Sequence, residues 1–126
     1  MEMTKDAISW FEIPALDFVR AKAFYSRIFD YEMPVITMGA NLMGFLLHEQ
    51  GAGVGGAIIH GDGSVPSREG TLVYLNGGAD LNTVLGRVEE AGGQVLLPKT
   101  GIGSSMGFFA LFLDTEGNRL GLHSMG

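Results

Sequence analysis

The order of predicted elements occurs twice along the chain, and this repetition limits the fold more than any other feature. Residues 8–15 alternate between two faces as a strand does, with Phe11 and Ile13 on one face and Trp10 and Glu12 on the other. Asp17 is a typical helix N-cap, and apolar residues then follow at helical spacing to about residue 29. Three further strands are predicted, at about 35–38, 42–48 and 54–60. The first half is therefore predicted to be βαβββ.

The second half shows the same order. Residues 71–75 are predicted to form a strand, and Asp80 is a second N-cap candidate. A helical stripe over residues 81–91 ends at Gly92-Gly93. The last three strands are predicted at about 94–97, 108–113 and 119–123.

A comparison of the two halves at an offset of 63 residues supports a duplication, because 63 is half of the 126-residue chain. Three features match at this offset: Asp17 with Asp80, Met43-Gly44-Phe45 with Met106-Gly107-Phe108, and His60 with His123.

The predicted fold class is therefore α+β, with two tandem βαβββ modules that form a curled, cup-like mixed eight-stranded sheet with two covering helices. The chain is long enough for one domain, residues 1–126, with module one at about 7–60, a turn-rich linker at 61–70 and module two at about 71–124. A cup about eight strands wide can hold one small ligand.

Composition and charge exclude several classes of function. Apolar residues make up 46% of the chain and charged residues 17%, which excludes intrinsic disorder. The net charge of −6 and the lack of a basic run disfavour binding to nucleic acid or to an anionic membrane. The absence of cysteine excludes disulfides and thiolate chemistry. No apolar run is long enough to span a bilayer, and no signal peptide is predicted, so we expect a cytoplasmic protein.

Two segments of the chain resemble a known superfamily. Residues 8–25, ISWFEIPALDFVRAKAFY, are similar to the first strand and helix of vicinal oxygen chelate proteins, and residues 114–123, DTEGNRLGLH, are similar to their last turn and strand. Ala91-Gly92-Gly93 is similar to the end of their second helix. The superfamily includes glyoxalase I, bleomycin-resistance proteins and extradiol dioxygenases. The resemblance implies paired βαβββ modules, usually in a homodimer, and in catalytic members a divalent metal that acts as a Lewis acid.

The resemblance also shows where this chain departs from the metal-binding pattern. The usual ligand positions fall on Trp10, Ile58, Val73 and Gly121, and none of these side chains can bind a hard divalent ion. The resemblance therefore predicts a small-molecule-binding protein without the usual metal or any other cofactor, which sequesters its ligand as bleomycin-resistance proteins do. A homodimer is expected, because a curled sheet leaves edges and an apolar face to cover.

Several residues are candidates for contact with that ligand. Glu12 shares the face of Trp10, and the alternation of the last strand places Arg119, Gly121 and His123 together on its polar face. The predicted ligand-binding residues are Trp10, Glu12, Phe45, Phe108, Arg119 and His123. Met43 and Met106 are further lining candidates, and residues 101–105 are predicted to be a loop that could serve as a lid.

Two alternatives remain open from the sequence. The chain could be a lyase, isomerase or dioxygenase of glyoxalase type, with Glu12 and His123 as catalytic acid or base, because desolvation beside Trp10 would make Glu12 a better proton acceptor. In a second form of this enzyme, Glu12, His60 and His123 would hold a divalent metal such as Fe, Mn, Ni or Zn. A structural or regulatory partner domain with an occluded cup is the other alternative.

Overall fold

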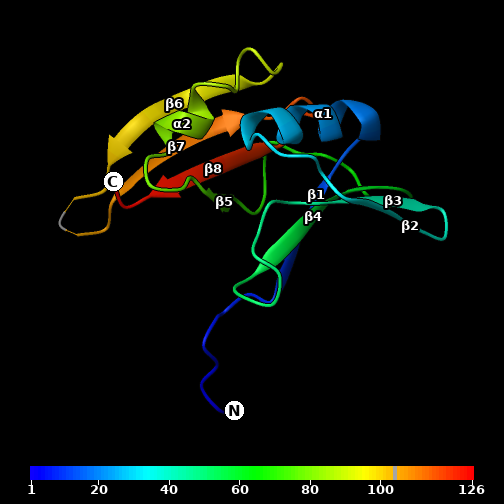
Figure 1. Ribbon diagram of the computed structural model, residues 1–126, viewed down its shortest axis with the longest axis horizontal. Coiled ribbons are helices and arrows are strands. Elements are labelled where there is room, and N and C mark those ends of the chain that lie inside the picture. Colours follow the sequence, from blue (N-terminus) through cyan, green and yellow to red (C-terminus); the bar gives the residue numbers. More distant parts are fainter. Residues whose placement is uncertain (104) are drawn as a thin grey trace.

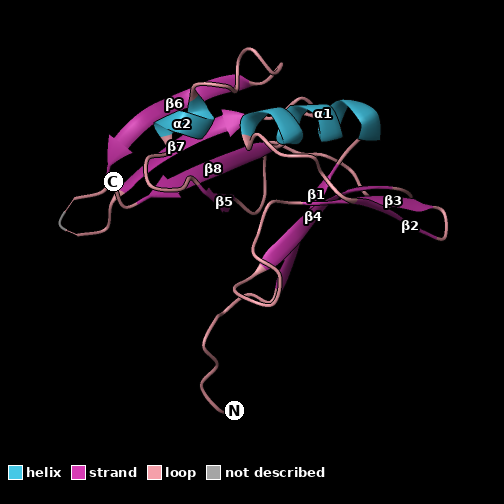
Figure 2. Cartoon of the chain, viewed as in Figure 1, coloured by secondary structure: helices cyan, strands magenta, loops and turns pink. Residues whose placement is uncertain are grey.

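The computed structural model describes residues 1–103 and 105–126 and confirms an α+β fold in which the order βαβββ occurs twice (Figure 1). Strands dominate the chain, and the described residues form two helices (Figure 2). The elements are β1 Trp10–Pro14, α1 Phe18–Ile28, β2 Val35–Met38, β3 Asn41–Phe45, β4 Gly55–His60, β5 Val73–Asn76, α2 Asn82–Leu85, β6 Gln94–Gly101, β7 Phe108–Leu113 and β8 Arg119–Ser124. The predicted lid at 101–105 includes residue 104, which lies outside the described residues.

The eight strands form two four-stranded sheets with the same topology. Their strand orders are β1-β4-β3-β2 and β5-β8-β7-β6. In each sheet the first and last strands of the repeat pair in parallel, and the other neighbours are antiparallel. The Ala15 amide donates to the Ile59 carbonyl in one repeat, and the Gly77 amide donates to the His123 carbonyl in the other. These equivalent bonds match Ala15 to Gly77 and Ile59 to His123.

The structural repeat is therefore real, but its register is not a constant 63 residues. Ala15 and Gly77 are 62 residues apart, whereas Ile59 and His123 are 64 apart. The matching triplets at residues 43–45 and 106–108 are not equivalent either, because Met43 lies within β3 while Met106 precedes β7. Because side chains alternate along a strand, an error of one residue moves a side chain to the opposite face of its sheet.

Helix α1 joins the two repeats through one continuous core. Asp17 is its N-cap, as predicted, and its Oδ1 accepts a hydrogen bond of 3.1 Å from the Arg20 amide. The buried residues of α1 belong to a cluster that includes residues of both sheets. Phe24 of α1 packs against Phe112 of β7 with the ring centroids 6.1 Å apart, and α1 also contacts β4 of the first sheet. The first helix therefore contributes to the core of both repeats.

The second helix is shorter than its apolar stripe predicts. Only four residues of the predicted 81–91 segment are α-helical, and turns continue to about residue 92. The stripe itself is correctly placed, because Leu81, Val84, Leu85 and Val88 are all buried. Asn82, Thr83 and Gly86 are weak helix formers, and several turns close with hydrogen bonds between residues three apart.

The turn between β7 and β8 connects the two repeats through buried polar groups. Asp114 accepts hydrogen bonds from the Tyr25 hydroxyl at 2.7 Å and from the amides of Glu116 and Asn118 at 2.8 and 2.9 Å. Asn118 in turn donates from Nδ2 to the Pro14 carbonyl at 2.7 Å. The residues that resemble the superfamily's last turn therefore stabilise the contact between repeats.

In the described part of the chain, no helix has both the length and the apolar character needed to cross a membrane.

Candidate functional site

Each sheet has one face that points away from the core, and we call these the first and second free faces. Ile13 and Ile58 are paired and buried, so they define the core side of the first sheet. Residues that directly face each other across a ladder share a side. Glu12 and Phe45 both pair with Ala57, and Trp10 is two residues from Glu12. The first free face therefore includes Trp10, Glu12 and Phe45, and by the same argument the second includes Tyr74, Phe109 and His123.

The first free face carries an accessible aromatic pair beside a carboxylate. The Trp10 side chain is 41% exposed, and its ring forms an edge-on pair with Phe45 at a centroid distance of 6.1 Å. Trp10 Nε1 donates to Glu12 Oε2 at 3.3 Å. The Tyr31 hydroxyl donates to the Phe45 carbonyl at 2.6 Å, and burial raises the pKa of Tyr31 well above its usual value. Glu12 itself is exposed, so the desolvation expected beside Trp10 is not found in the single chain.

The second free face has a matching arrangement. Tyr74 is 48% exposed and forms an edge-on pair with Phe109 at a centroid distance of 6.3 Å. His123 lies with Nε2 2.8 Å from the Met106 carbonyl oxygen. These residues and Ile102 line a shallow, mainly apolar pocket of about 520 Å³. Arg119 lies on the same face of β8, two residues from Gly121, as the alternation predicts.

Two candidate residues lie on the core side of their strands instead. His60 has the same orientation as Ile58, and its Nδ1 lies 2.9 Å from the Ala15 carbonyl oxygen. Phe108 pairs with Ser124, packs against the core and has Lys99 Nζ 4.5 Å from its ring centroid. The position beside His123 belongs to Phe109, which the sequence analysis missed. The pairing of Tyr74 with Phe109 depends on the strand register, which the sequence does not provide.

The positions predicted for a metal ligand are also divided between the two faces. Ile58 and Val73 face the core, so only Trp10 and Gly121 lie on the free faces. A Cβ atom on Gly121 would overlap the Tyr74 ring, so an aromatic ring covers this position. Within residues 1–103 and 105–126, no three His, Asp or Glu side chains lie close enough together to hold a metal ion. Glu12, His60 and His123 are therefore not brought together within one chain.

This arrangement leads to a prediction for Gly121→Ala. The added methyl group should displace the Tyr74 ring and separate it from Phe109, with a loss of about 1 kcal/mol in the free energy of unfolding. Urea denaturation and the near-ultraviolet circular dichroism of the tyrosines measure the two effects. Gly101→Ala is the matched control, because its Cβ would lie 3.9 Å from the Phe108 ring, an ordinary contact. Equal losses in both variants would contradict the prediction.

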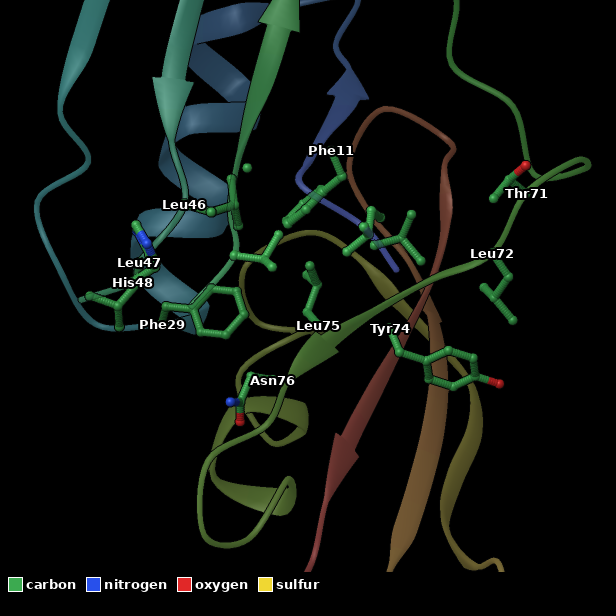
Figure 3. Close-up of a pocket in the computed structure, with 15 residues that line it drawn as sticks. Phe11, Phe29, Leu46, Leu47, His48, Thr71, Leu72, Tyr74, Leu75 and Asn76 are labelled. Carbon is green, nitrogen blue, oxygen red and sulfur yellow. The ribbon is translucent and has the colours of Figure 1, made fainter. Parts of the chain in front are cut away.

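A second cavity lies where the two repeats meet, and the sequence analysis did not predict it. Its volume is about 340 Å³, and segments of both repeats line it: Ile8, Phe11, Phe29, residues 46–48, residues 54–56 and residues 71–76. Figure 3 shows Phe11, Phe29 and Leu75 around the middle of this junction cavity, with Thr71 at one end and His48 and Asn76 at the other. Phe11 and Leu75 are on the core sides of their sheets, whereas Tyr74, which also lines the cavity, belongs to the second free face.

The repeated fold and the paired free faces define a protein of the vicinal oxygen chelate type. The family model for the glyoxalase/bleomycin resistance protein/dioxygenase superfamily matches residues 7–122, and the chain belongs to this superfamily.

Solved structures have the same fold at low sequence identity. A glyoxalase/bleomycin resistance protein from Albidiferax ferrireducens has a TM-score of 0.69 and 11% identity, covering 96% of this chain and 100% of that one. The fosfomycin resistance protein FosX from Listeria monocytogenes has a TM-score of 0.64 and 20% identity, covering 98% and 94%. The antibiotic-binding protein TnmS3 from a Streptomyces species has a TM-score of 0.57 and 21% identity, covering 99% and 100%. A search of curated proteins gave no match.

Proposed function

We propose that this chain binds a small planar aromatic molecule on its free faces and sequesters it, without the metal used by catalytic members of the superfamily. The observation that carries the proposal is that each free face has an accessible, edge-on aromatic pair, Trp10 with Phe45 and Tyr74 with Phe109. Aromatic side chains of this kind stack on flat ligands. The free-face positions at which the superfamily places metal ligands hold Trp10 and Gly121, neither of which is a metal ligand.

Charge favours a cationic ligand on the first free face. The Glu12 carboxylate lies beside Trp10, and the chain has a net charge of −6. A tryptophan ring attracts a cation through its negative face, and the neighbouring carboxylate adds to this attraction. The proposed ligand is therefore a planar aromatic cation. An antibiotic-binding protein among the structures of the same fold is consistent with a role in ligand sequestration.

The proposal includes a homodimer in the cytoplasm. Apolar side chains on the free side of β2, Ile36 and Met38, are exposed in the single chain, and Tyr74 is exposed on the second free face. A second copy that covers part of these faces would enclose the ligand and desolvate Glu12. Light scattering of the purified protein measures the assembly, and a monomer at all concentrations would contradict this part of the proposal.

The test uses 9-aminoacridine as a cationic aromatic probe. Binding should shift the indole N–H signal of Trp10, the only tryptophan in the chain, in proton–nitrogen correlation spectra. Trp10→Ala should weaken binding about fivefold to tenfold, which corresponds to about 1 kcal/mol for a half-exposed cation–π contact. Glu12→Gln should weaken it by a smaller factor that decreases at high salt.

Matched controls make this test specific. Glu69→Gln makes the same charge change at an exposed residue of the linker and should leave binding unchanged. If Glu12→Gln and Glu69→Gln have equal effects, only the net charge matters and the proposed site is wrong. If Trp10→Ala binds 9-aminoacridine as well as the unmodified protein does, the proposed site is also wrong.

Metal analysis separates the binding protein from the enzyme alternative. Untagged protein should contain no stoichiometric metal before or after incubation with Fe, Mn, Ni and Zn salts. Metal that disappears in Glu12→Ala or His123→Ala would contradict the proposal. So would turnover of dicarbonyl adducts or catechols that is lost in Glu12→Gln.

A further inference from the structure

We propose that the junction cavity is a second ligand site, which takes an uncharged, mainly apolar molecule of about one or two rings with a hydrogen-bond acceptor at one end. This proposal does not rest on the function proposed for the free faces, although Tyr74 lines both this cavity and the pocket beside Phe109 and His123. Its volume of about 340 Å³ lies at the lower end of the range for small-molecule pockets, roughly 300–1,000 Å³.

The glycine pair Gly55-Gly56 in β4 allows the backbone to form one wall of the cavity. A Cβ on Gly56 would overlap the Phe11 ring, and a Cβ on Gly55 would lie 3.1 Å from the His48 imidazole and 3.3 Å from the Trp10 ring. Without these side chains, the Phe11 ring lies directly against β4, and the His48 ring approaches the strand closely. The Phe11 and His48 positions at the cavity therefore depend on glycine at both residues.

The lining is apolar in the middle and polar at its ends. Phe11, Phe29 and Leu75 form the middle, and Leu47 and Leu72 extend the apolar surface. The lining residues include no Asp, Glu, Lys or Arg. A charged ligand would lose its hydration without gaining an opposite charge, so the cavity favours an uncharged molecule.

The polar end of the cavity offers hydrogen-bond donors. Asn76 Oδ1 accepts a hydrogen bond of 2.9 Å from the Gly78 amide, which fixes the orientation of the side-chain amide. The Nδ2 group has no acceptor among the described residues, and the same residues provide no partner for the His48 imidazole. Asn76 and His48 therefore can donate to an oxygen acceptor on the ligand. A phenol or an aromatic ketone has this combination of an apolar body and a single polar end.

A ligand here would bridge the two repeats. Phe11 and residues 46–48 belong to the first repeat, while residues 71–76 belong to the second. A ligand that binds the folded chain but not the unfolded chain raises the midpoint of thermal unfolding as the ligand concentration increases. Occupation of the junction cavity should therefore stabilise the whole chain.

The test uses 2-naphthol as a neutral probe, with nuclear magnetic resonance as the site-specific readout. Binding should shift the backbone amide signals of Gly55, Gly56 and Leu75, with at most a small shift of the Trp10 indole signal, because the Trp10 ring borders Gly55. Leu72→Trp should fill the cavity and weaken binding at least tenfold. Leu47→Trp is a second filling variant at a side chain that is 56% exposed, where a larger side chain is tolerated.

The controls distinguish this site from the free faces. Met106→Ala changes a side chain that lines the pocket beside Phe109 and His123 but not the junction cavity, and should leave the affinity for 2-naphthol unchanged. In turn, 9-aminoacridine should bind equally well to Leu72→Trp and to the unmodified protein. The inference is wrong if both filling variants bind 2-naphthol normally, or if 2-naphthol shifts the signals of Trp10 and Phe109 instead. Failure of the 9-aminoacridine test alone would affect only the function proposed for the free faces.

Discussion

Replacement of Asp114 by alanine is expected to lower the free energy of unfolding by about 4 kcal/mol, the largest effect among the substitutions considered. Asp114 is 5% exposed, and its two oxygens accept four hydrogen bonds. The donors are the Tyr25 hydroxyl, the Glu116 amide, and both the backbone amide and the side-chain amide of Asn118. Alanine would leave these buried donors without an acceptor, and each unsatisfied group carries a desolvation cost.

The hydrogen bond to Tyr25 can be measured separately. The Tyr25 side chain is fully buried, and burial together with the Asp114 carboxylate raises its pKa well above the usual value, so Tyr25 remains a neutral donor. Tyr25→Phe should cost about 1.5–3 kcal/mol, because the acceptor is charged. A double-mutant cycle with Asp114→Asn in urea should give a coupling energy of at least about 1 kcal/mol. Additive effects would show that the 2.7 Å contact contributes little.

Asp62→Ala is the matched control for Asp114→Ala. Asp62 is an exposed residue of the linker, and its replacement should change stability by less than about 0.5 kcal/mol. If Asp114→Ala has no larger effect than Asp62→Ala, the turn between β7 and β8 does not stabilise the contact between repeats. If Asp114→Ala does not fold, Asp114→Asn still tests the same network, with an expected loss of about 2 kcal/mol.

The sequence predicted the elements well because the strongest signals are local. Periodicity placed β2 and β7 at their observed bounds, and the capping residue Asp17 marked the start of α1. The length of α2 was wrong because burial of an apolar stripe does not require a regular helix. Leu81 and Val88 are buried whether the backbone forms α-helical or tighter turns between them.

The candidate site was harder to predict because it depends on register between distant strands. The identity of His60 and His123 at an offset of 63 suggested equivalent positions, but His123 is equivalent to Ile59. Because of this one-residue difference in register, the two histidines lie on opposite faces of their sheets. Trp10 and Glu12 were correctly placed on one face because the alternation within β1 did not depend on that offset.

The junction cavity had no signal in the sequence that could have identified it. Phe11, Phe29 and Leu75 are typical core residues, and each alone indicates ordinary packing. The cavity exists because residues near β1, β4 and β5, which are far apart in the sequence, line one space in the folded chain. The glycine pair Gly55-Gly56 lies in the strand predicted at about 54–60, and it became informative only beside Phe11.

Replacement of Glu116 by alanine is expected to have the second largest effect, a loss of about 3 kcal/mol in the free energy of unfolding. The Glu116 side chain is buried in the β7–β8 turn, yet it caps the helix of the other repeat. Its Oε1 accepts the Asp17 amide at 2.7 Å, and Arg20 Nε and Nη2 donate to its two oxygens at 2.7 and 3.0 Å. Alanine would remove this link between α1 and the second sheet.

Glu90→Ala is the matched control, because Glu90 also forms an ion pair with an arginine of α1. The Arg27 to Glu90 distance is 3.2 Å, but both side chains are more than half exposed. Exposed ion pairs contribute little, so Glu90→Ala should cost less than about 1 kcal/mol. Comparison of the two variants by urea denaturation separates the buried link from a solvated one. Equal losses would contradict the role of burial.

The contribution of Glu116 to the free energy of unfolding should also depend on pH. Burial acts to raise the pKa of Glu116, but the hydrogen bonds from Arg20, the Asp17 amide and Thr115 outweigh it and lower the pKa below its usual value of 4.5. A carboxyl group with a lower pKa in the folded state stabilises the fold above its unfolded-state pKa, and this contribution is lost as the pH falls through the folded-state value. Glutamine does not titrate. The stability difference between the unmodified protein and Glu116→Gln should therefore be constant near neutral pH and decrease below about pH 4.5. An equal difference at pH 3 and pH 7 would show that Glu116 acts through packing rather than through its charge.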